Sequence, residues 1–415
     1  MRKEKIYGKI ISVRNSFCVP QKGGVFPIKK TGFRATFRKY ALDFFQHADI
    51  FLLVICLICS AISLFAVKTA TGHLDAAGYG VGSTKCVIVQ SASIMIGVGA
   101  FVLFTFVDPD ILGNQWKILV AVNVLLMVAL VIFGSADDTG NKSWIRFAGI
   151  GIQPSEVIKI LYVIVSAKQM TYLKEYKDIN SFPSVVMMAG HFALVFLAIQ
   201  VISSDLGSAT IILAIFLVMF FCLGVKIYWF VIGFAAVAAV IPLLWTYFLK
   251  SYQKQRLLAP YDPSVDPEGY GIRWQTTQSR TTLASGRMTG VDTGHSTVFT
   301  GKHTDFIFSC IGEQLGMVGC IVVVILLTII ILRCYYIGIH SGRTFDMLVC
   351  CGMGTAIAFQ TFINMGMCIG ITPVIGLTLP FFSYGGSSMV TLFAAMGVVS
   401  GVKYKPKPER FTLAT

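Results

Sequence analysis

Two Asp-Pro pairs stand close together in a strongly basic stretch, 249–303. Asp262-Pro263 and Asp266-Pro267 are both good turn formers, and their spacing alone favours a pair of turns. The basic residues are Lys250, Lys254, Arg256, Arg273, Arg280, Arg287 and Lys302, against Asp262, Asp266, Glu268 and Asp292. Such an excess of cations either binds an anionic ligand or is merely solvated in a long loop. Both interpretations remain open at this point.

A second set of ionisable residues, Glu156 and Lys159, lies within an apolar run at about 153–170. An ionised side chain in the middle of a bilayer costs about 2.5–3.5 kcal/mol on insertion scales, so such residues need an explanation. On a helix their spacing places both on one face, where they can pair and lower that cost. The pair either fixes how a short helix packs or lines a polar cavity, and both alternatives place it inside a helix bundle.

The remaining polar residues and the cysteines have simpler explanations. Asp205 begins an apolar run in SSDLGSA, where its carboxylate can cap a helix by accepting backbone N–H bonds. Of the 11 cysteines, all but Cys18 lie in or beside apolar runs and are interpreted as small hydrophobic residues. No CxxC pair with a second Cys or His pair stands in a loop, so the sequence predicts neither a zinc site nor a disulfide framework.

Membrane helices must position these residues, because the chain is too apolar for a soluble protein. Hydrophobic residues make up 55% of its 415 positions and charged residues only 13%. So few polar residues cannot cover the apolar ones, and the composition also excludes disordered and collagen-like chains. The net charge of +14 falls in tails and loops, which favours membrane orientation and anionic membrane lipids as its cause and not nucleic acid.

Ten runs of roughly bilayer-spanning length follow the basic N-terminal stretch. They are about 49–67, 86–107, 117–134, 153–170, 185–203, 205–224, 226–248, 304–333, 346–368 and 380–402. The sequence thus predicts an all-α polytopic membrane protein, with one ten-helix domain over 48–402. An even number of spans puts the basic tails, 1–47 and 403–415, on the same side, which the positive-inside rule makes cytoplasmic. The long loop 249–303, between spans 7 and 8, is then extracellular.

The stretch 364–388 differs from the other apolar runs in being poorly suited to a continuous helix. Its sequence, NMGMCIGITPVIGLTLPFFSYGGSS, carries Pro373, Pro380 and several glycines. We therefore expect a broken or re-entrant segment. Irregular backbone at membrane depth must be buried in protein or line a cavity, because lipid cannot satisfy its peptide groups. This reasoning predicts a site near the outer leaflet.

Four of these segments, taken in order, resemble the SEDS family (shape, elongation, division and sporulation), whose members include RodA, FtsW and SpoVE. They are WIRFAGIGIQPSEVIK (144–159), YQKQRLLAPYDPSVDPEG (252–269), KHTDFIFSCIGEQLGMVG (302–319) and the stretch 364–388. One departure is Ser204-Asp205-Leu206-Gly207, where the family usually has Pro-Asp-Leu-Gly. A second is GYGIRWQTTQS after Asp266, about two residues longer than the family pattern, so either Gln275 or Gln278 matches the motif.

The resemblance implies a peptidoglycan glycosyltransferase in the bacterial cytoplasmic (plasma) membrane. It would polymerise lipid II into β-1,4 glycan chains at the outer face, usually together with a class B penicillin-binding protein, a transpeptidase. Asp266 stands at the position of the family's essential carboxylate and would act as general base, with inversion at the donor carbon. Arg256 stands where a basic residue precedes the DP motif, and Glu156 and Lys159 match the family's buried pair.

The chemistry implied by the resemblance needs cations more than a second carboxylate. A diphosphate leaves without protonation if its growing charge is held by basic groups, and Arg256 and Lys302 are expected near it. His303 either organises the return of the loop to the membrane or faces the substrate cavity. The sequence identifies no cofactor with certainty; a divalent cation, Mg²⁺ or Mn²⁺, would suit diphosphate oxygens, although no carboxylate cluster indicates a site for one.

Two functions of other classes stay open on the sequence. A ten-span bundle with a central Glu–Lys pair would also suit a flippase or transporter for lipid-linked precursors. Against it, the sequence has no inverted repeat, and its chemical residues lie in one outer loop and not at a midplane. A non-catalytic scaffold that recruits a transpeptidase is the other alternative.

Overall fold

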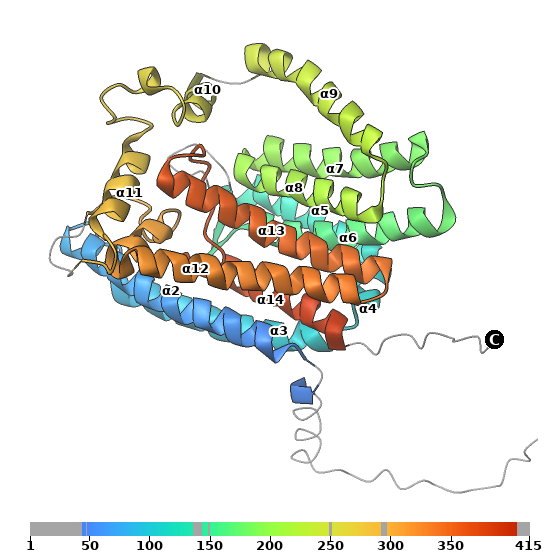
Figure 1. Cartoon of the computed structure of the whole chain (residues 1–415), viewed down its shortest axis with the longest axis horizontal. Helices are drawn as coiled ribbons and strands as arrows, with labels where there is room; N and C mark the ends of the chain where they lie inside the picture. The colour runs from blue at the N-terminus through green and yellow to red at the C-terminus, as the bar shows by residue number, and fades with distance from the viewer. Residues whose placement is uncertain are drawn as a thin grey trace, which may run out of the picture. The chain divides into compact units, whose positions relative to one another are not determined.

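The computed structural model describes residues 44–46, 48–135, 143–147, 150–248, 251–291 and 297–404. The tails expected at 1–47 and 403–415 lie almost wholly outside these residues. The chain divides into two units, and the second unit, which begins at His47, contains every element discussed below. In this second unit the elements are helices, apart from one small sheet (Figure 1).

Nine helices in the described part of the chain are long and apolar enough to cross a membrane. They are α2 (Ile50–Ala76), α3 (Ser83–Phe106), α5 (Trp116–Phe133), α7 (Phe182–Ser203), α8 (Leu206–Leu223), α9 (Ile227–Leu243) with its continuation η1 (Leu244–Phe248), α12 (Ile307–His340), α13 (Thr344–Ile369) and α14 (Gly386–Tyr404). Each coincides with one of the predicted runs. The prediction of a polytopic helical membrane protein is therefore confirmed, and Figure 1 shows α7, α8, α13 and α12 running side by side.

The predicted run at 153–170 forms α6 (Pro154–Tyr176), whose charged residues lower its hydropathy. Its 23 residues would extend about 35 Å at 1.5 Å per residue, which exceeds the hydrocarbon core of a bilayer. The helix packs against α5, α7, α8 and α13 and buries Tyr162 almost completely. Glu156 and Lys159 are tolerated there because they face other helices and not lipid.

Local sequence explains where several helices begin and end. Pro154 occupies the first turn of α6, where its missing N–H has no partner to lose. Asp205 caps α8 as predicted, because its Oδ1 accepts the Ser208 N–H at 2.9 Å. Ser204, at the end of α7, has a left-handed backbone with φ 53°. A proline at this position, with φ fixed near −65°, would not fit this backbone, so the departure from the family pattern suits the local conformation.

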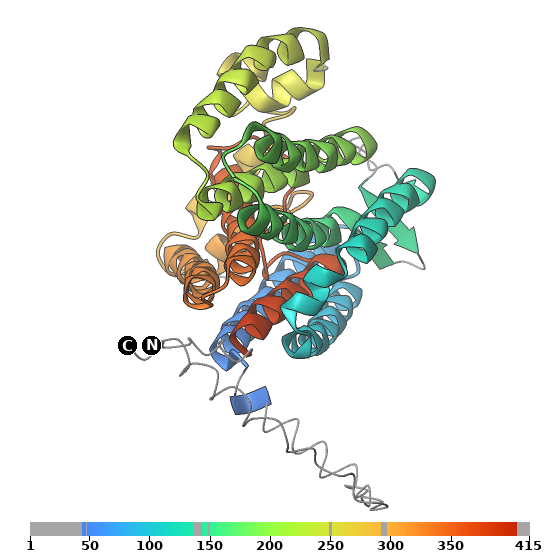
Figure 2. The same cartoon turned by 90° about the vertical axis from the view of Figure 1, so that its right-hand side faces the viewer.

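One small sheet accompanies the predicted helices in the described part of the chain. Strands β1 (Gly134–Ser135), β2 (Trp144–Phe147) and β3 (Ile150–Ile152) form a small antiparallel sheet in the order β1-β2-β3. Figure 2 shows the strands near the end of α5. Strands of two to four residues are too short for alternating polarity to identify them in a sequence, so the sequence analysis predicted no strand here.

The predicted outer loop, 249–303, also contains regular structure. It includes α10 (Ser251–Leu258), the short 3₁₀ helix η2 (Pro263–Val265) and α11 (Trp274–Ser285). The segment after α11 fits into a kink of α12 at Gly316, where φ is 65°. A Cβ atom on Gly316 would lie 2.4 Å from the Met288 backbone, and the Met317 N–H donates to the Arg287 carbonyl at 2.9 Å. Helix α12 therefore fixes the end of α11.

Residues 370–385, between α13 and α14, are irregular, as their glycines and prolines predict. Neighbouring helices satisfy their peptide groups. The Asn364 side chain on α13 donates to the Leu377 carbonyl at 2.6 Å, and Gln90 on α3 donates to the Ser383 carbonyl at 3.1 Å. Gln90 also accepts the Gly385 N–H at 3.2 Å. This connection is hereafter called the 370–385 segment, and hydrogen bonds to α13 and α3 hold it in the bundle.

Candidate functional site

The Asp266 carboxylate is enclosed by the turn that follows it. Its Oδ1 accepts the Gly269 N–H at 3.1 Å, and its Oδ2 accepts the N–H groups of Gly271 at 2.9 Å and Arg273 at 3.0 Å. Gly269 has φ 71°, a conformation that favours glycine, and a Cβ atom on Gly271 would lie 3.2 Å from Oδ2. The two glycines therefore let the backbone wrap around the carboxylate.

These bonds stabilise the charged form of Asp266. The Arg273 N–H has the largest effect in lowering the pKa of the carboxyl group below its ordinary value, and the N–H groups of Gly271 and Gly269 and the Arg273 charge act in the same direction. The group is therefore ionised at neutral pH. A carboxylate has about four lone-pair sites, and three are occupied here, so one remains for another donor.

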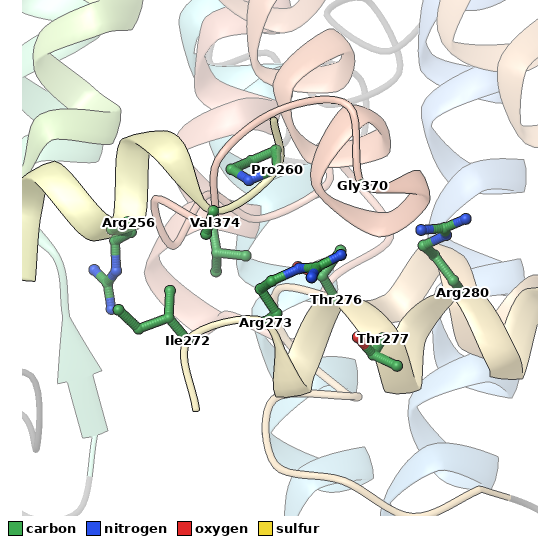
Figure 3. A pocket seen from close by; sticks show the side chains of 10 residues that line it. Arg256, Pro260, Ile272, Arg273, Thr276, Thr277, Arg280, Gly370 and Val374 are labelled. Carbon is green, nitrogen blue, oxygen red and sulfur yellow. The ribbon is translucent and has the colours of Figure 1, made fainter. Parts of the chain in front are cut away.

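A pocket beside this turn is lined by three arginines: Arg256 from α10, Arg273 just before α11, and Arg280 from α11. Figure 3 shows Arg273 between the other two, with Val374 and Gly370 of the 370–385 segment on another side. The pocket is open and contains roughly 410 Å³, part of it open solvent. No carboxylate belongs to its lining. Three guanidinium groups without an acidic neighbour in the lining suit an anion with several oxygens.

Two of these arginines were not singled out from the sequence. Arg273, which caps the start of α11, and Arg280, within α11, are seven residues apart, which is about two helical turns, and both line the pocket. That spacing would have associated them once a helix was predicted there. Their meeting with Arg256 and Gly370 depends on how α10, α11 and α13 pack, which local spacing does not reveal.

Asp266 and the arginine pocket are linked through Arg273. The Arg273 backbone N–H binds the Asp266 carboxylate, its Nη1 donates to the Asp266 carbonyl at 3.5 Å, and the same side chain lines the pocket. The structure thus links Asp266, through Arg273, to the pocket that Arg256 also lines. The arrangement is a carboxylate with a free lone pair at the edge of a cationic pocket.

Lys302 lies elsewhere than expected. Its side chain has an exposed fraction of 0%, and Nζ pairs with the Glu313 carboxylate at 2.5 Å and donates to the Thr297 carbonyl at 2.7 Å. Glu313 also accepts the Thr297 N–H at 3.0 Å. In this conformation Lys302 therefore anchors the returning loop on α12 and does not face the pocket. The sequence identified Lys302 as a cation, but it did not show that Glu313 would pair with it.

His303 follows Lys302 and organises the junction with the 370–385 segment. Its carbonyl accepts the Tyr384 N–H at 3.0 Å, and the two rings lie 5.7 Å apart. Burial lowers the pKa of the imidazole, which favours its neutral form. Nδ1 is buried and has no hydrogen-bond partner among the described residues. This placement fits the structural alternative for His303.

Glu156 and Lys159 form the expected pair, with Nζ 2.8 Å from Oε1 and both side chains buried. Lys159 also donates to the Gln360 Oε1 at 3.2 Å, and Glu156 accepts the Ser388 hydroxyl at 3.4 Å. Gln360 donates in turn to the Thr378 carbonyl at 2.9 Å. The pair thus connects α6 to α13, to α14 and, through Gln360, to the 370–385 segment. It does not belong to the lining of the arginine pocket.

Metal binding by protein ligands alone has little support in the described residues. Among them no three His, Cys, Asp or Glu side chains come together. A divalent cation at this site would need oxygen ligands from a bound phosphate in addition to a protein carboxylate.

The comparisons with known proteins agree with one another. The model of the FtsW/RodA/SpoVE family, described as cell cycle protein, matches residues 49–407. The peptidoglycan glycosyltransferase MrdB of Escherichia coli K12 is 30% identical over 365 residues, 86% of this chain and 93% of that protein. The probable peptidoglycan glycosyltransferase FtsW of Bacillus subtilis is 30% identical over 381 residues, 88% of this chain and 92% of that protein.

Solved structures share the fold. A chain from a structure described as a peptidoglycan synthase complex that coordinates polymerization and crosslinking has a TM-score of 0.73 and 26% identity, covering 86% of this chain and 97% of that chain. RodA of Thermus thermophilus has a TM-score of 0.61 and 22% identity, and the similarity covers 86% of this chain and 96% of RodA.

Proposed function

The chain belongs to the FtsW/RodA/SpoVE family of bacterial multi-pass membrane proteins, and we propose that it is a peptidoglycan glycosyltransferase that polymerises lipid II. The relatives named as peptidoglycan glycosyltransferases support the activity. The observation that carries the proposal within this chain is the arginine pocket beside the Asp266 carboxylate. The reaction takes place at the outer face of the membrane, with both tails in the cytoplasm.

The donor in this reaction holds its sugar through an α-linked diphosphate, and a β-1,4 product requires attack from the opposite face with inversion. The 4-hydroxyl of the acceptor attacks the anomeric carbon, its proton passes to Asp266, and the carbon–oxygen bond to the diphosphate breaks. Asp266 keeps one lone-pair site for this proton because its three backbone bonds occupy the others. Its lowered pKa keeps it ionised and ready to accept.

The leaving diphosphate carries the charge that the pocket can hold. Arg256, Arg273 and Arg280 offer guanidinium forks that match phosphate oxygens, and fixed cations stabilise charge as it develops. In this proposal Arg273 and Arg280 take the role first expected for Lys302, whose charge is already paired. No acid is then needed to protonate the leaving group.

The Glu156–Lys159 pair supports the pocket indirectly, through hydrogen bonds to the 370–385 segment. It holds the 370–385 segment through Gln360 and Thr378, and that segment supplies Gly370 and Val374 to the pocket. We assign the pair a positioning role. A polar cavity lined by the pair is the alternative, and the two roles differ in their response to a neutral double variant, described in the Discussion.

Two further components belong to the proposal. A class B penicillin-binding protein is the partner, since one structural neighbour comes from a complex that couples polymerization to crosslinking. A divalent cation, Mg²⁺ or Mn²⁺, can bridge the diphosphate and a protein carboxylate. Adding a chelator to the polymerisation assay tests the cation: an unchanged rate removes it from the reaction.

Purified protein in nanodiscs with fluorescent lipid II tests the function. Wild type should produce glycan chains, resolved by gel electrophoresis, and Asp266→Asn should produce none while remaining folded. Asp262→Asn is the matched control, because the Asp262 carboxylate accepts the Ser264 N–H at 2.9 Å and caps η2, whereas the Asp266 carboxylate binds the pocket residue Arg273. Movement of lipid II across vesicles without polymer would indicate the flippase, and neither activity would indicate the scaffold.

A further inference from the structure

The turn that encloses Asp266 also exposes an aromatic pair. Tyr270 and Trp274 stack with their ring centroids 5.9 Å apart and an interplanar angle of 28°. Their exposed fractions are 76% for Tyr270 and 36% for Trp274, so both rings keep surface that a ligand can reach. Burial in the protein core therefore does not explain this pair, and an exposed aromatic surface indicates a ligand or an interface.

The chain fixes this pair relative to Asp266. Tyr270 stands between Gly269 and Gly271, and both glycine N–H groups bind the Asp266 carboxylate. Trp274 is the first residue of α11 and follows Arg273, the third residue that donates to the carboxylate. The aromatic rings therefore belong to the same six-residue stretch, 269–274, whose N–H groups hold the Asp266 carboxylate.

The same turn also borders the anion site. Ile272 and Arg273, which separate Tyr270 from Trp274 in sequence, line the arginine pocket. One short segment thus presents a cationic pocket, a carboxylate and an aromatic surface. A glycosyl acceptor needs a surface of this last kind, because one face of a pyranose ring carries C–H groups that pack against aromatic rings, while its hydroxyl groups need polar partners.

We propose that Tyr270 and Trp274 form the subsite for the acceptor sugar, an N-acetylated pyranose with a free 4-hydroxyl. Stacking of the sugar on this pair places the 4-hydroxyl within reach of the open lone pair of Asp266. The anionic part of the donor occupies the neighbouring pocket, so the two substrates approach from different sides of the turn. The inference rests on the proposed function for the identity of the acceptor.

Saccharide binding to the full chain tests this subsite without catalysis. The protein carries Asp266→Asn and sits in nanodiscs, and the probe is a soluble, lipid-free N-acetylglucosaminyl-N-acetylmuramyl peptide, followed by saturation-transfer NMR. Trp274→Ala and Tyr270→Ala should each weaken binding about three- to tenfold, in line with the energies of aromatic contacts. Trp274→Phe and Tyr270→Phe should keep most of the affinity, which separates stacking from loss of the turn.

Tyr261 provides a matched control. It lies in the same outer region with an exposed fraction of 68% but is not a member of the stacked pair, so Tyr261→Ala should bind the saccharide like the parent. In the Asp266→Asn background, the inference fails if Trp274→Ala and Tyr270→Ala bind the saccharide as tightly as the parent protein does. It also fails if their only effect is lost quenching of tryptophan fluorescence by brominated lipid, because the pair would then be a membrane anchor.

Turnover distinguishes failure of this inference from failure of the proposed function. In the wild-type background, Trp274→Ala should raise the KM for lipid II several-fold with a smaller change in kcat. A protein that polymerises lipid II with alanine variants unchanged in KM and in saccharide binding refutes the subsite alone. A protein that binds the saccharide through the pair but makes no polymer refutes the glycosyltransferase proposal and leaves the sugar site.

Discussion

Removal of one member of the Glu156–Lys159 pair should destabilise the bundle more than removal of both. Glu156→Gln leaves the Lys159 ammonium buried with only neutral acceptors, of which Gln360 at 3.2 Å is one. Breaking a buried pair in this way typically costs 3–5 kcal/mol. Because Gln360 stays in place and the new amide oxygen can accept a bond, we expect the lower end, about 3 kcal/mol.

The neutral double variant Glu156→Gln/Lys159→Met should recover much of this loss. It removes the uncompensated charge and leaves a methionine of similar length among apolar neighbours such as Tyr162. The double variant should therefore be about 2 kcal/mol more stable than Glu156→Gln, so the effects of the two single substitutions should not add in the double-mutant cycle. At about 2 °C per kcal/mol, the value suited to a long chain, the single variant should melt about 6 °C lower and the double about 2 °C lower.

A thiol-reactive dye can follow unfolding, because buried native cysteines such as Cys56 and Cys334 become accessible only on unfolding. Lys174→Met, an exposed substitution on the same helix, is the control and should leave the midpoint unchanged. Additive effects of the two single substitutions would refute an energetically coupled pair. If the double variant regains stability but makes no glycan, the pair lines a functional cavity and our positioning role is wrong.

The remaining predictions concern the outer region. Arg256→Ala should raise the KM for lipid II about tenfold and more than Arg256→Lys, which keeps the charge and loses the fork; equal, negligible effects in steady-state kinetics would remove Arg256 from the pocket's function. An impermeant thiol reagent should label Ser264→Cys in intact cells and Ser181→Cys only after lysis, in a background without reactive native thiols, and the opposite pattern would invert the topology. Asp262→Asn should retain most polymerisation, and loss equal to that of Asp266→Asn would remove the distinction between the two carboxylates. Because backbone N–H groups lower the pKa of Asp266, its charge and the turn that the charge stabilises persist above the ordinary carboxyl pKa and are lost as pH falls through the lower folded value. The acid limb of kcat/KM due to Asp266 should therefore lie below the usual carboxyl range, and a loss near pH 6 would identify another group.

Several features of this protein were determined by sequence alone, because they depend on neighbours within a few residues. The apolar runs predict the helices, including α6, whose charges lower its hydropathy. Spacing along α6 paired Glu156 with Lys159, and position at a helix start made Asp205 a cap. Glycines and prolines predicted the break in the 370–385 segment, since backbone conformation is a local property.

Tertiary structure decided which charges meet, because residues far apart in the chain supply them. Lys302 and Arg256 are both cations of one loop, yet packing buries the first against Glu313 and leaves the second in a pocket with residues of α11. The residues of the turn after Asp266 are plain in the sequence, but the sequence does not show their hydrogen bonds. Only the folded path of the turn brings three backbone N–H groups onto the carboxylate. The local sequence does not distinguish these cations from one another. Long-range packing decides which of them pairs with a carboxylate and which lines the pocket beside Asp266.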